Sequence, residues 1–318
     1  MLGLIRRMVG LSAVSGILMA GPALAAGDPP ECRQVRFSDV GWSDITATTA
    51  IASKILEGLG YKPKATILSV PVTFASLKNK DIDAFLGLWL PTQTEYIQPY
   101  FDEGSIERVT TNLTGAKYTL AVPRYVHDSG VREFGDLQKF KDRFAGKLYG
   151  IEPGNDGNKL IQDMIEKNAF ELAGWKLVES SEQGMLSQVA RATRRKKWIV
   201  FLGWEPHPMN RRFQMAYLGG GDDWFGPNFG GATVDTLASK GYTRRCPNVG
   251  HLLGNLTFTL DMENQMMGWI LDEGMEPEAA AEKLLKENPD LLGRWLEGVT
   301  TFDGREDGLA AVKRHLRM

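Results

Sequence analysis

The chain has 318 residues, of which 43% are hydrophobic and 24% are charged, and its formal net charge is −2. A chain of this kind forms one large or two medium-sized globular domains with a sizeable core. Charges of both signs are spread along it. The densest basic run, residues 191–197, is typical of the solvated end of one helix. We therefore expect no nucleic-acid partner.

The N-terminus has the pattern of a secretory signal peptide. Arg6 and Arg7 precede an apolar run from Met8 to Ala20, and Ala23-Leu24-Ala25 has the small residues of a cleavage site. The run is too short for a membrane span, and no Cys follows it that could carry a lipid. We expect residues 1–25 to be removed near Ala25. The mature chain would then lie outside the cytoplasm with a formal net charge of −4.

The cysteine content fits an extracytoplasmic protein. The chain has only two cysteines, Cys32 and Cys246, and a single pair in an oxidising compartment is expected to form a disulfide. The alternative is a pair of buried thiols. We expect no metal site, because the four histidines lack ligand spacing: His127, His207, His251 and His315. We also expect no cofactor.

Strands and helices are expected to alternate in the first third of the chain, which predicts a parallel sheet with helices on its faces. Ser43 and Asp44 are suitable N-cap residues for the first helix. A tryptophan, Trp42, therefore lies at a strand-to-helix turn. The expected strands are 34–40, 64–70 and 82–88, and the expected helices are 46–58, 72–79 and 92–101.

A second α/β unit is expected after a crossing at Thr114-Gly115. Its polar turn, residues 152–158, opens a helix, and backbone N–H groups and Asn155 at such a helix start are well placed to bind a ligand. A strand at 108–113 is expected before the crossing. The strands expected after it are 117–122, 147–151, 175–179 and 198–203, and the expected helices are 134–144, 159–167 and 185–193.

The remainder of the chain is expected to return to the first lobe. A strand at 213–218 is followed by helices at 255–272, 277–287, 289–297 and 307–316. The expected division is residues 26–113 and 207–318 for lobe I and residues 114–206 for lobe II. We expect a hinge between the lobes at Leu113–Gly115 and Glu205–His207.

One short motif occurs twice, as Phe85-Leu86-Gly87-Leu88-Trp89-Leu90-Pro91 and as Phe201-Leu202-Gly203-Trp204-Glu205-Pro206. Each copy places a tryptophan at the end of a strand that a proline terminates. Ligands of open α/β sheets bind outside the carboxyl ends of the strands. The repeat therefore predicts two similar lobes that face each other across a cleft.

Catalytic motifs are absent from the sequence: no G-x-S-x-G elbow and no H-E-x-x-H occurs. The aromatic residues at strand ends remain, namely Trp42, Trp89 and Trp204, with Tyr118 as a further candidate. Aromatic faces arranged as a box attract a cation, and a quaternary ammonium needs such a site because it has no N–H to donate. The alternative is that each aromatic side chain packs in the core.

These residues resemble a known family, the periplasmic substrate-binding proteins of glycine betaine/choline ABC transporters, and within it the choline-binding members. The resemblance covers essentially the whole mature chain. Its motifs are Gly41-Trp42-Ser43-Asp44, Asp83 to Pro91, Tyr118 to Pro123 and Trp204-Glu205-Pro206-His207-Pro208.

The resemblance implies a two-lobed α/β fold of the type II periplasmic binding proteins. Each lobe would be a mainly parallel sheet flanked by helices, and two hinge strands would close the lobes over the ligand. It also implies a four-aromatic box for the ligand's cation, with Trp42 and Trp89 from the first lobe and Tyr118 and Trp204 from the second. Asp44 and Asn155 match the residues that hold the alcohol group of choline.

Asp44 discriminates between ligands, because a carboxylate accepts a hydrogen bond from the hydroxyl of choline but repels the carboxylate of glycine betaine. We expect acetylcholine, which lacks the donor, to bind more weakly. The expected protein is a monomeric, non-enzymatic periplasmic receptor that delivers choline to an ABC permease and its ATPase. The alternatives are a glycine betaine or proline betaine receptor, an extracytoplasmic enzyme acting on a quaternary amine, and a ligand-sensing subunit of a signalling complex.

Overall fold

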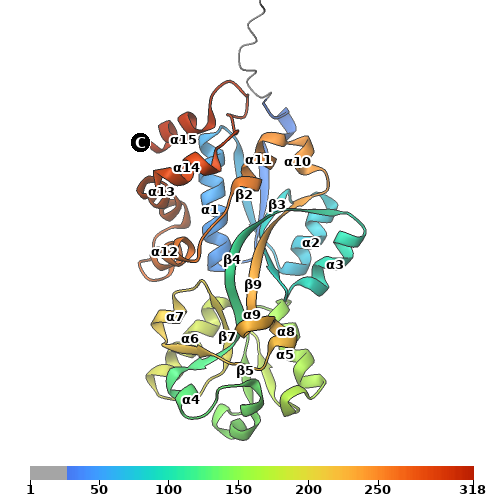
Figure 1. The fold of residues 1–318 in the computed structure, drawn as a ribbon, viewed down its shortest axis with the longest axis vertical. Coiled ribbons are helices and arrows are strands. Elements are labelled where there is room, and N and C mark those ends of the chain that lie inside the picture. The colour runs from blue at the N-terminus through green and yellow to red at the C-terminus, as the bar shows by residue number, and fades with distance from the viewer. Residues whose placement is uncertain (1–26) are drawn as a thin grey trace, which may run out of the picture.

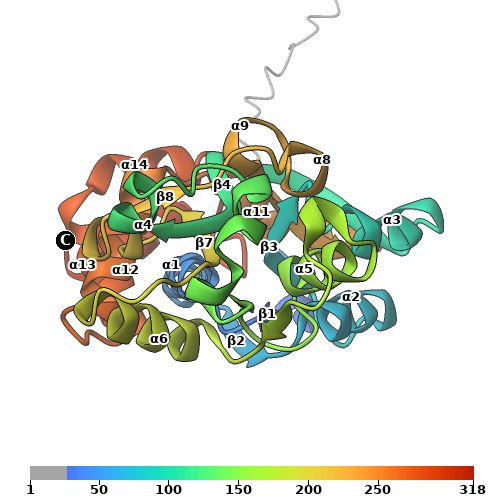
Figure 2. The same cartoon turned by 90° about the horizontal axis from the view of Figure 1, so that it is seen from below.

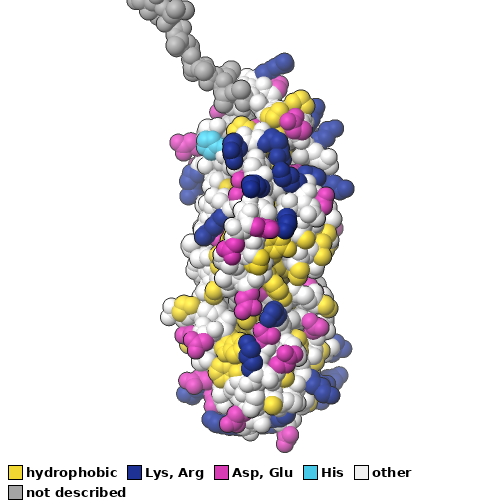
Figure 3. Space-filling view, turned by 90° about the vertical axis from the view of Figure 1, so that its right-hand side faces the viewer, with side chains coloured by type: hydrophobic (Ala, Val, Ile, Leu, Met, Phe, Trp, Pro, Cys, Tyr) yellow, Lys and Arg dark blue, Asp and Glu magenta, His cyan; other side chains and the backbone are white. Residues whose placement is uncertain are grey.

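The computed structural model of this chain describes residues 27–318 and divides into an upper and a lower lobe (Figure 1). The expected signal peptide, residues 1–25, lies outside the described residues. Within residues 27–318, no helix is both long enough and apolar enough to cross a membrane. The face in Figure 3 carries positive and negative side chains interspersed, in agreement with the small net charge.

The upper lobe is built from both ends of the described chain, which places the two segments side by side (Figure 1). Its first part contains β1 (Gln34–Asp39), α1 (Ser43–Gly58), β2 (Lys62–Ile67), α2 (Val70–Asn79), β3 (Ala84–Leu90) and α3 (Thr94–Asp102). Its second part contains α10 (Tyr242–Arg245), α11 (Pro247–Asn255), α12 (Leu260–Leu271), α13 (Pro277–Glu287), α14 (Pro289–Trp295) and α15 (Gly308–Leu316).

The lower lobe is formed by the middle of the chain. Its elements are α4 (Arg124–Asp128), three short 3₁₀ helices (Phe134–Asp136, Gln138–Phe144 and Ala169–Glu171), β5 (Lys147–Tyr149), α5 (Asp156–Glu166), β6 (Lys176–Val178), α6 (Glu182–Arg194), β7 (Phe201–Glu205), α7 (Met209–Arg212), β8 (Met215–Tyr217), α8 (Asp222–Phe225) and α9 (Pro227–Gly230). Seen from below, α8 and α9 lie together beside the end of β4 (Ile106–Pro123) (Figure 2).

Two long strands, β4 and β9 (Gly231–Ser239), pass between the lobes (Figure 1). They pair antiparallel from Ile106↔Ser239 to Lys117↔Gly231. The nine strands form one sheet in the order β2-β1-β3-β9-β4-β7-β5-β6, with β8 paired to β4. Within each lobe, the pairs β1–β2, β1–β3, β5–β6 and β5–β7 are parallel, and helices flank them. The expected α/β fold with two lobes is confirmed.

The crossings between the lobes differ from those expected. Residues 108–122 were expected as two strands, but the pairing with β9 is continuous through register shifts, so a single strand forms. The strand at 231–239 was not expected at all, and it carries the return to the upper lobe. The prediction that the chain returns to the upper lobe at Glu205–His207 is therefore wrong. The expected strand at 213–218 was also misplaced, because β8 pairs with Ala121–Pro123 in the lower lobe.

Side chains cap the two helices of the lower lobe that begin near the cavity. Asn155 and Ser181 cap α5 and α6, accepting hydrogen bonds from the backbone N–H groups of Asn158 and Gly184. Helix α1 has no such cap, since it begins at Ser43 after the N-cap residue Trp42, which provides no side-chain cap. Ser43 and Asp44 therefore lie in the first turn rather than at the cap, and their side chains make other contacts.

The expected disulfide between Cys32 and Cys246 is present, and both cysteines are buried. It joins the first and second parts of the upper lobe across 214 residues of sequence. Because the chain leaves this lobe and returns, the disulfide fixes the two segments to each other.

Candidate ligand-binding site

All six residues expected to bind the ligand line one cavity, where the two lobes meet. The cavity is small, and side chains from both lobes line it. The lining residues are Trp42, Asp44, Trp89, Tyr118, Ile151, Asn155, Asp156 and Trp204.

Four aromatic side chains form the walls of the cavity. Trp42 and Trp89 come from the upper lobe, at the start of α1 and in β3. Tyr118 and Trp204 are paired residues of β4 and β7 in the lower lobe. All four are only 4–6% exposed. The Tyr118 ring lies 6.1 Å from that of Trp89 and 6.2 Å from that of Trp204, with both pairs edge to face.

The two copies of the repeated motif have the same local structure. Trp89 and Trp204 lie within the last residues of β3 and β7, rather than just beyond the strands as expected. The proline of each copy follows a cis peptide bond, at Leu90-Pro91 and at Glu205-Pro206. Each copy thus presents its tryptophan from one lobe into the shared cavity.

Asp44 brings a carboxylate into the cavity. It is buried, and its Oδ2 accepts a hydrogen bond of 3.2 Å from the indole Nε1 of Trp89. Its Oδ1 is also buried and has no hydrogen-bond partner among the described residues. Burial raises the pKa of this carboxyl to about 7, and the nearby carboxylate of Glu182 adds to the increase.

Asn155 and Tyr118 are held together at the start of α5. The Tyr118 hydroxyl donates to Oδ1 of Asn155 at 2.9 Å, and the same oxygen accepts the capping bond from the Asn158 N–H at 3.1 Å. The Asn155 amide nitrogen has only a long contact of 3.5 Å, to Asp156. This close packing requires glycine at position 157, since a Cβ there would overlap the Tyr118 hydroxyl. The Asn155 amide group remains available as a donor to a ligand.

Asp156 is a lining residue that the sequence analysis did not identify. It is buried, its Oδ2 has no hydrogen-bond partner within residues 27–318, and burial raises its pKa to about 6. Asp156 lies in the polar turn that was noted, but an acidic residue in the first turn of a helix is usually explained by the helix dipole. Ile151, also missed, precedes this turn and gave no chemical signal.

A third carboxylate, that of Glu152, does not line the cavity but holds the side chain of Trp42, which does. Glu152 Oε1 accepts a hydrogen bond of 2.8 Å from the indole Nε1 of Trp42, which joins the lower lobe to the upper. Burial raises the pKa of Glu152 to about 7.

The charged residues that line the cavity are both acidic, namely Asp44 and Asp156. Of residues 27–318, two buried carboxyl groups and no Lys, Arg or His line it. Buried charges require a counter-charge or protonation, which explains the raised pKa values. A cationic ligand would supply the missing counter-charge. Within the described part of the chain, no cluster of His, Cys, Asp and Glu is arranged to hold a metal ion.

Comparison with known proteins agrees with this geometry. Residues 33–287 match the OpuAC family, described as the substrate binding domain of ABC-type glycine betaine transport systems. The chain belongs to this family. The family is a substrate-binding component of transporters and not an enzyme, which implies a membrane permease as partner and a position outside the cytoplasm.

Individual relatives fall into choline-binding and betaine-binding proteins. A structure of an ABC-transporter choline binding protein in complex with choline is 60% identical, with a TM-score of 0.90, and the match covers 91% of this chain and all of that one. An unliganded, semi-closed choline binding protein structure is 59% identical over the same shares of both chains, with a TM-score of 0.84. The glycine betaine/carnitine transport binding protein GbuC of Listeria monocytogenes is 31% identical, over 52% of this chain and 54% of that protein.

Proposed function

We propose that this protein is the choline receptor of an ABC importer and that it binds choline in the cavity between its lobes. One observation carries the proposal. In the described part of the chain, four buried aromatic rings and two carboxyl oxygens without partners surround a space that no cationic side chain enters. A small organic cation satisfies both features, and the 60% identical choline complex supports this choice.

The rings of Trp42, Trp89, Tyr118 and Trp204 would surround the trimethylammonium group. Each face attracts a cation with roughly 0.5–2 kcal/mol, and the larger values apply to desolvated sites such as this one. A trimethylammonium group has no N–H, so it loses no hydrogen bond on entering an aromatic cavity. An amine that carries N–H groups would leave its donors unsatisfied there.

Asp44 and Asn155 would hold the hydroxyl group. The Oδ1 of Asp44 would accept a hydrogen bond from the hydroxyl group, and the Asn155 amide would donate to the hydroxyl oxygen. Acetylcholine has an ester in place of the hydroxyl and cannot donate to Asp44, so it binds more weakly.

A glycine betaine or proline betaine receptor is the second candidate, and the family description and GbuC favour it. The acidic lining of the cavity disfavours a betaine ligand. The carboxylate of a betaine would lie between Asp44 and Asp156 in a medium where charges are poorly screened. A betaine could avoid this repulsion only if one of these carboxyl groups stayed protonated.

We further propose that the protein is a periplasmic monomer, released by cleavage near Ala25, that closes on choline and presents it to the permease. The moving units would meet along β4 and β9, near Leu113 and Ala232, where the register between the two strands shifts. Closure brings the upper-lobe residues Trp42 and Asp44 against the lower-lobe residues Asn155 and Trp204.

Isothermal titration calorimetry with choline, acetylcholine, glycine betaine and proline betaine tests the assignment. We expect choline to bind at least tenfold more tightly than either betaine, with acetylcholine between them. Tighter binding of a betaine would establish the second candidate instead. Turnover of choline by the purified protein would point to an enzyme.

A further inference from the structure

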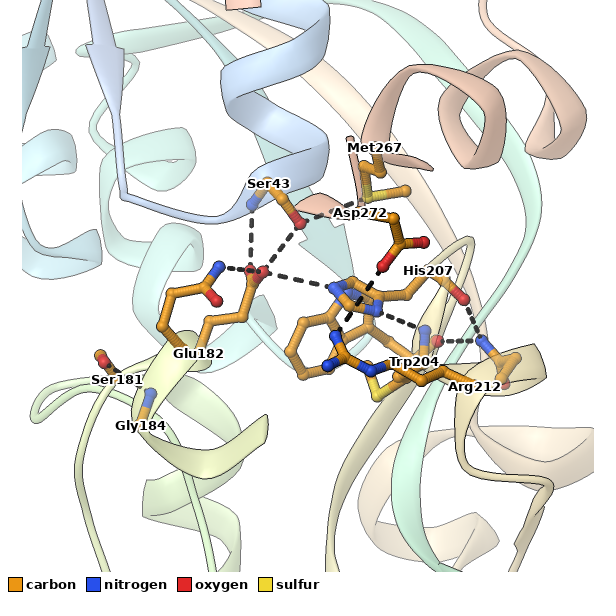
Figure 4. Close-up of polar contacts among 12 residues, drawn as sticks. Ser43, Ser181, Glu182, Gly184, Trp204, His207, Arg212, Met267 and Asp272 are labelled. Atoms are coloured by element: carbon orange, nitrogen blue, oxygen red, sulfur yellow. Dashed lines mark hydrogen bonds and ion pairs between the residues drawn. The ribbon is translucent and has the colours of Figure 1, made fainter. Parts of the chain in front are cut away.

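A buried polar cluster lies beside the ligand cavity and joins the two lobes, with Glu182 at its centre (Figure 4). Glu182 is the first residue of α6 in the lower lobe, whereas Ser43 is the first residue of α1 in the upper lobe. Oε2 of Glu182 accepts the backbone N–H of Ser43 at 3.0 Å, and Oε1 accepts the Ser43 hydroxyl at 2.8 Å.

Glu182 therefore performs for α1 the task of an N-cap side chain. The first N–H groups of a helix have no partner within the helix and need an acceptor, and a negative charge there is favourable. The N-cap residue of α1, Trp42, has no side chain that can accept such a bond. The cap comes from the other lobe, so it can exist only while the lobes are closed.

His207 holds Glu182 from the opposite side. The Met209 backbone N–H donates to His207 Nδ1 at 2.9 Å, so Nδ1 is an acceptor and the proton of the neutral ring lies on Nε2. His207 Nε2 is 3.3 Å from Oε1 of Glu182 and donates to it. Both side chains are only 2% exposed. Neither lines the ligand cavity, although His207 belongs to the motif that follows Trp204.

The cluster connects the two walls of the cavity. Ser43 lies between Trp42 and Asp44, which belong to the upper wall. The His207 ring packs edge to face against Trp204 of the lower wall, with centroids 5.0 Å apart. A displacement of Glu182 would therefore be transmitted to three lining residues at once.

We propose that Glu182 is a positioning residue for ligand binding, which caps α1 from the opposite lobe and so holds Trp42 and Asp44 against Trp204 in the closed protein. The inference rests on the proposed function, because it concerns the closed form that retains the ligand. The cap forms only after closure, so it slows ligand release and leaves the initial encounter with the open protein unchanged.

Glu182→Gln tests the proposal. The two carboxylate oxygens now accept from four donors, on Ser43, His207 and Gln183, whereas glutamine has a single acceptor oxygen. Stopped-flow tryptophan fluorescence with choline should show dissociation roughly 10- to 100-fold faster, as expected from the loss of charge-assisted hydrogen bonds. The association rate constant should stay within about twofold. Glu166→Gln, an exposed change of the same charge on α5, is the control and should alter neither rate.

A second measurement does not depend on choline. Single-molecule energy transfer between dyes at exposed positions of each lobe, Lys64 and Lys139, reports the fraction of closed molecules. Glu182→Gln should lower this fraction both without ligand and with choline. Ser43→Ala removes one donor but keeps the backbone N–H, and it should have a smaller effect in the same direction.

The outcomes separate the two proposals. If the unaltered protein does not bind choline, the proposed function fails, and the closed fraction without ligand still tests Glu182. If Glu182→Gln and Ser43→Ala leave both the dissociation rate and the closed fraction unchanged, the positioning role is overturned.

Discussion

The indole nitrogen of Trp89 donates a hydrogen bond to one oxygen of Asp44, while the other oxygen of the same carboxyl group has no partner in the cavity wall. This arrangement orients the free oxygen and leaves it available to a ligand. A buried acceptor without a partner is unfavourable, so the cavity favours ligands that bring a donor or a positive charge.

Asp44→Asn removes the negative charge and keeps the shape. Because a hydrogen bond to a charged group contributes about 1.5–3 kcal/mol, we expect choline affinity to fall roughly 10- to 100-fold in calorimetry. Glycine betaine should lose less affinity, or gain some, because its repulsion is relieved. Asp128→Asn, whose side chain is 66% exposed, is the control and should leave both ligands unaffected. An unchanged preference between the two ligands in Asp44→Asn would contradict the selectivity assigned to Asp44.

Trp204→Ala removes one face of the proposed aromatic box. The loss of a desolvated cation–π contact and of apolar contact area should weaken choline binding at least tenfold. Trp198→Ala is a matched control, since Trp198 lies in the same lobe but does not line the cavity. Retention of choline affinity within twofold in Trp204→Ala would show that the cation binds elsewhere.

The carboxyl groups at the cavity predict an unusual dependence of stability on pH. The pKa values of Asp44 and Glu152 are raised to about 7 and that of Asp156 to about 6, whereas unfolded carboxyl groups titrate near 4. The folded protein therefore binds more protons between pH 4 and pH 7. The stability contributed by these groups is fully present below about pH 4 and is lost as the pH rises through about 7.

Bound choline should oppose the loss of stability with rising pH, because choline binds best when the carboxyl groups are ionised. Between pH 5 and pH 8 we expect the melting temperature of the free protein to fall and the increase caused by saturating choline to become larger. Asp44→Asn should show a smaller change with pH. An equal effect of choline at pH 5 and pH 8 would mean that these carboxyl groups do not respond to the ligand.

A neutral isostere separates shape from charge. In 3,3-dimethylbutan-1-ol a carbon atom replaces the nitrogen of choline, and the hydroxyl is kept. It loses the attraction of four aromatic faces and of the carboxylates, so we expect affinity at least 100-fold below that of choline. Comparable affinities in competition binding would assign the cavity to apolar ligands rather than to cations.

The disulfide should contribute to stability without affecting the ligand. Replacing Cys32 and Cys246 by serine should lower the free energy of unfolding by about 2–5 kcal/mol, because the bridge closes a very long loop. Denaturant titration measures this loss. Choline affinity should be unchanged, since neither cysteine lines the cavity. A change in affinity would imply that the bridge positions the upper wall.

Local patterns in the sequence were sufficient for the parts of the site that depend on strand ends and helix starts. Trp89 and Trp204 follow from the repeated motif, and Asn155 from the turn that opens α5. Asp44 was expected at the cap of a helix beginning at Thr46, but the helix begins three residues earlier, at Ser43, where Glu182 of the other lobe takes the capping role. A local pattern contains no information about such a partner.

The parts that were missed depend on contacts distant in sequence. The pairing of β4 with β9 joins segments more than 100 residues apart, and it determines where the chain returns to the upper lobe. Asp156 resembles any acidic residue in a first helical turn. Its burial, which gives it a role in the cavity, appears only when the two lobes are assembled.

A crystal structure of the mature protein with choline tests the central claim most directly. We expect the trimethylammonium group to contact the rings of Trp42, Trp89, Tyr118 and Trp204, with the hydroxyl within hydrogen-bonding distance of Asp44 and Asn155. Choline bound outside this cavity, or bound with its ammonium group away from the four rings, would contradict it.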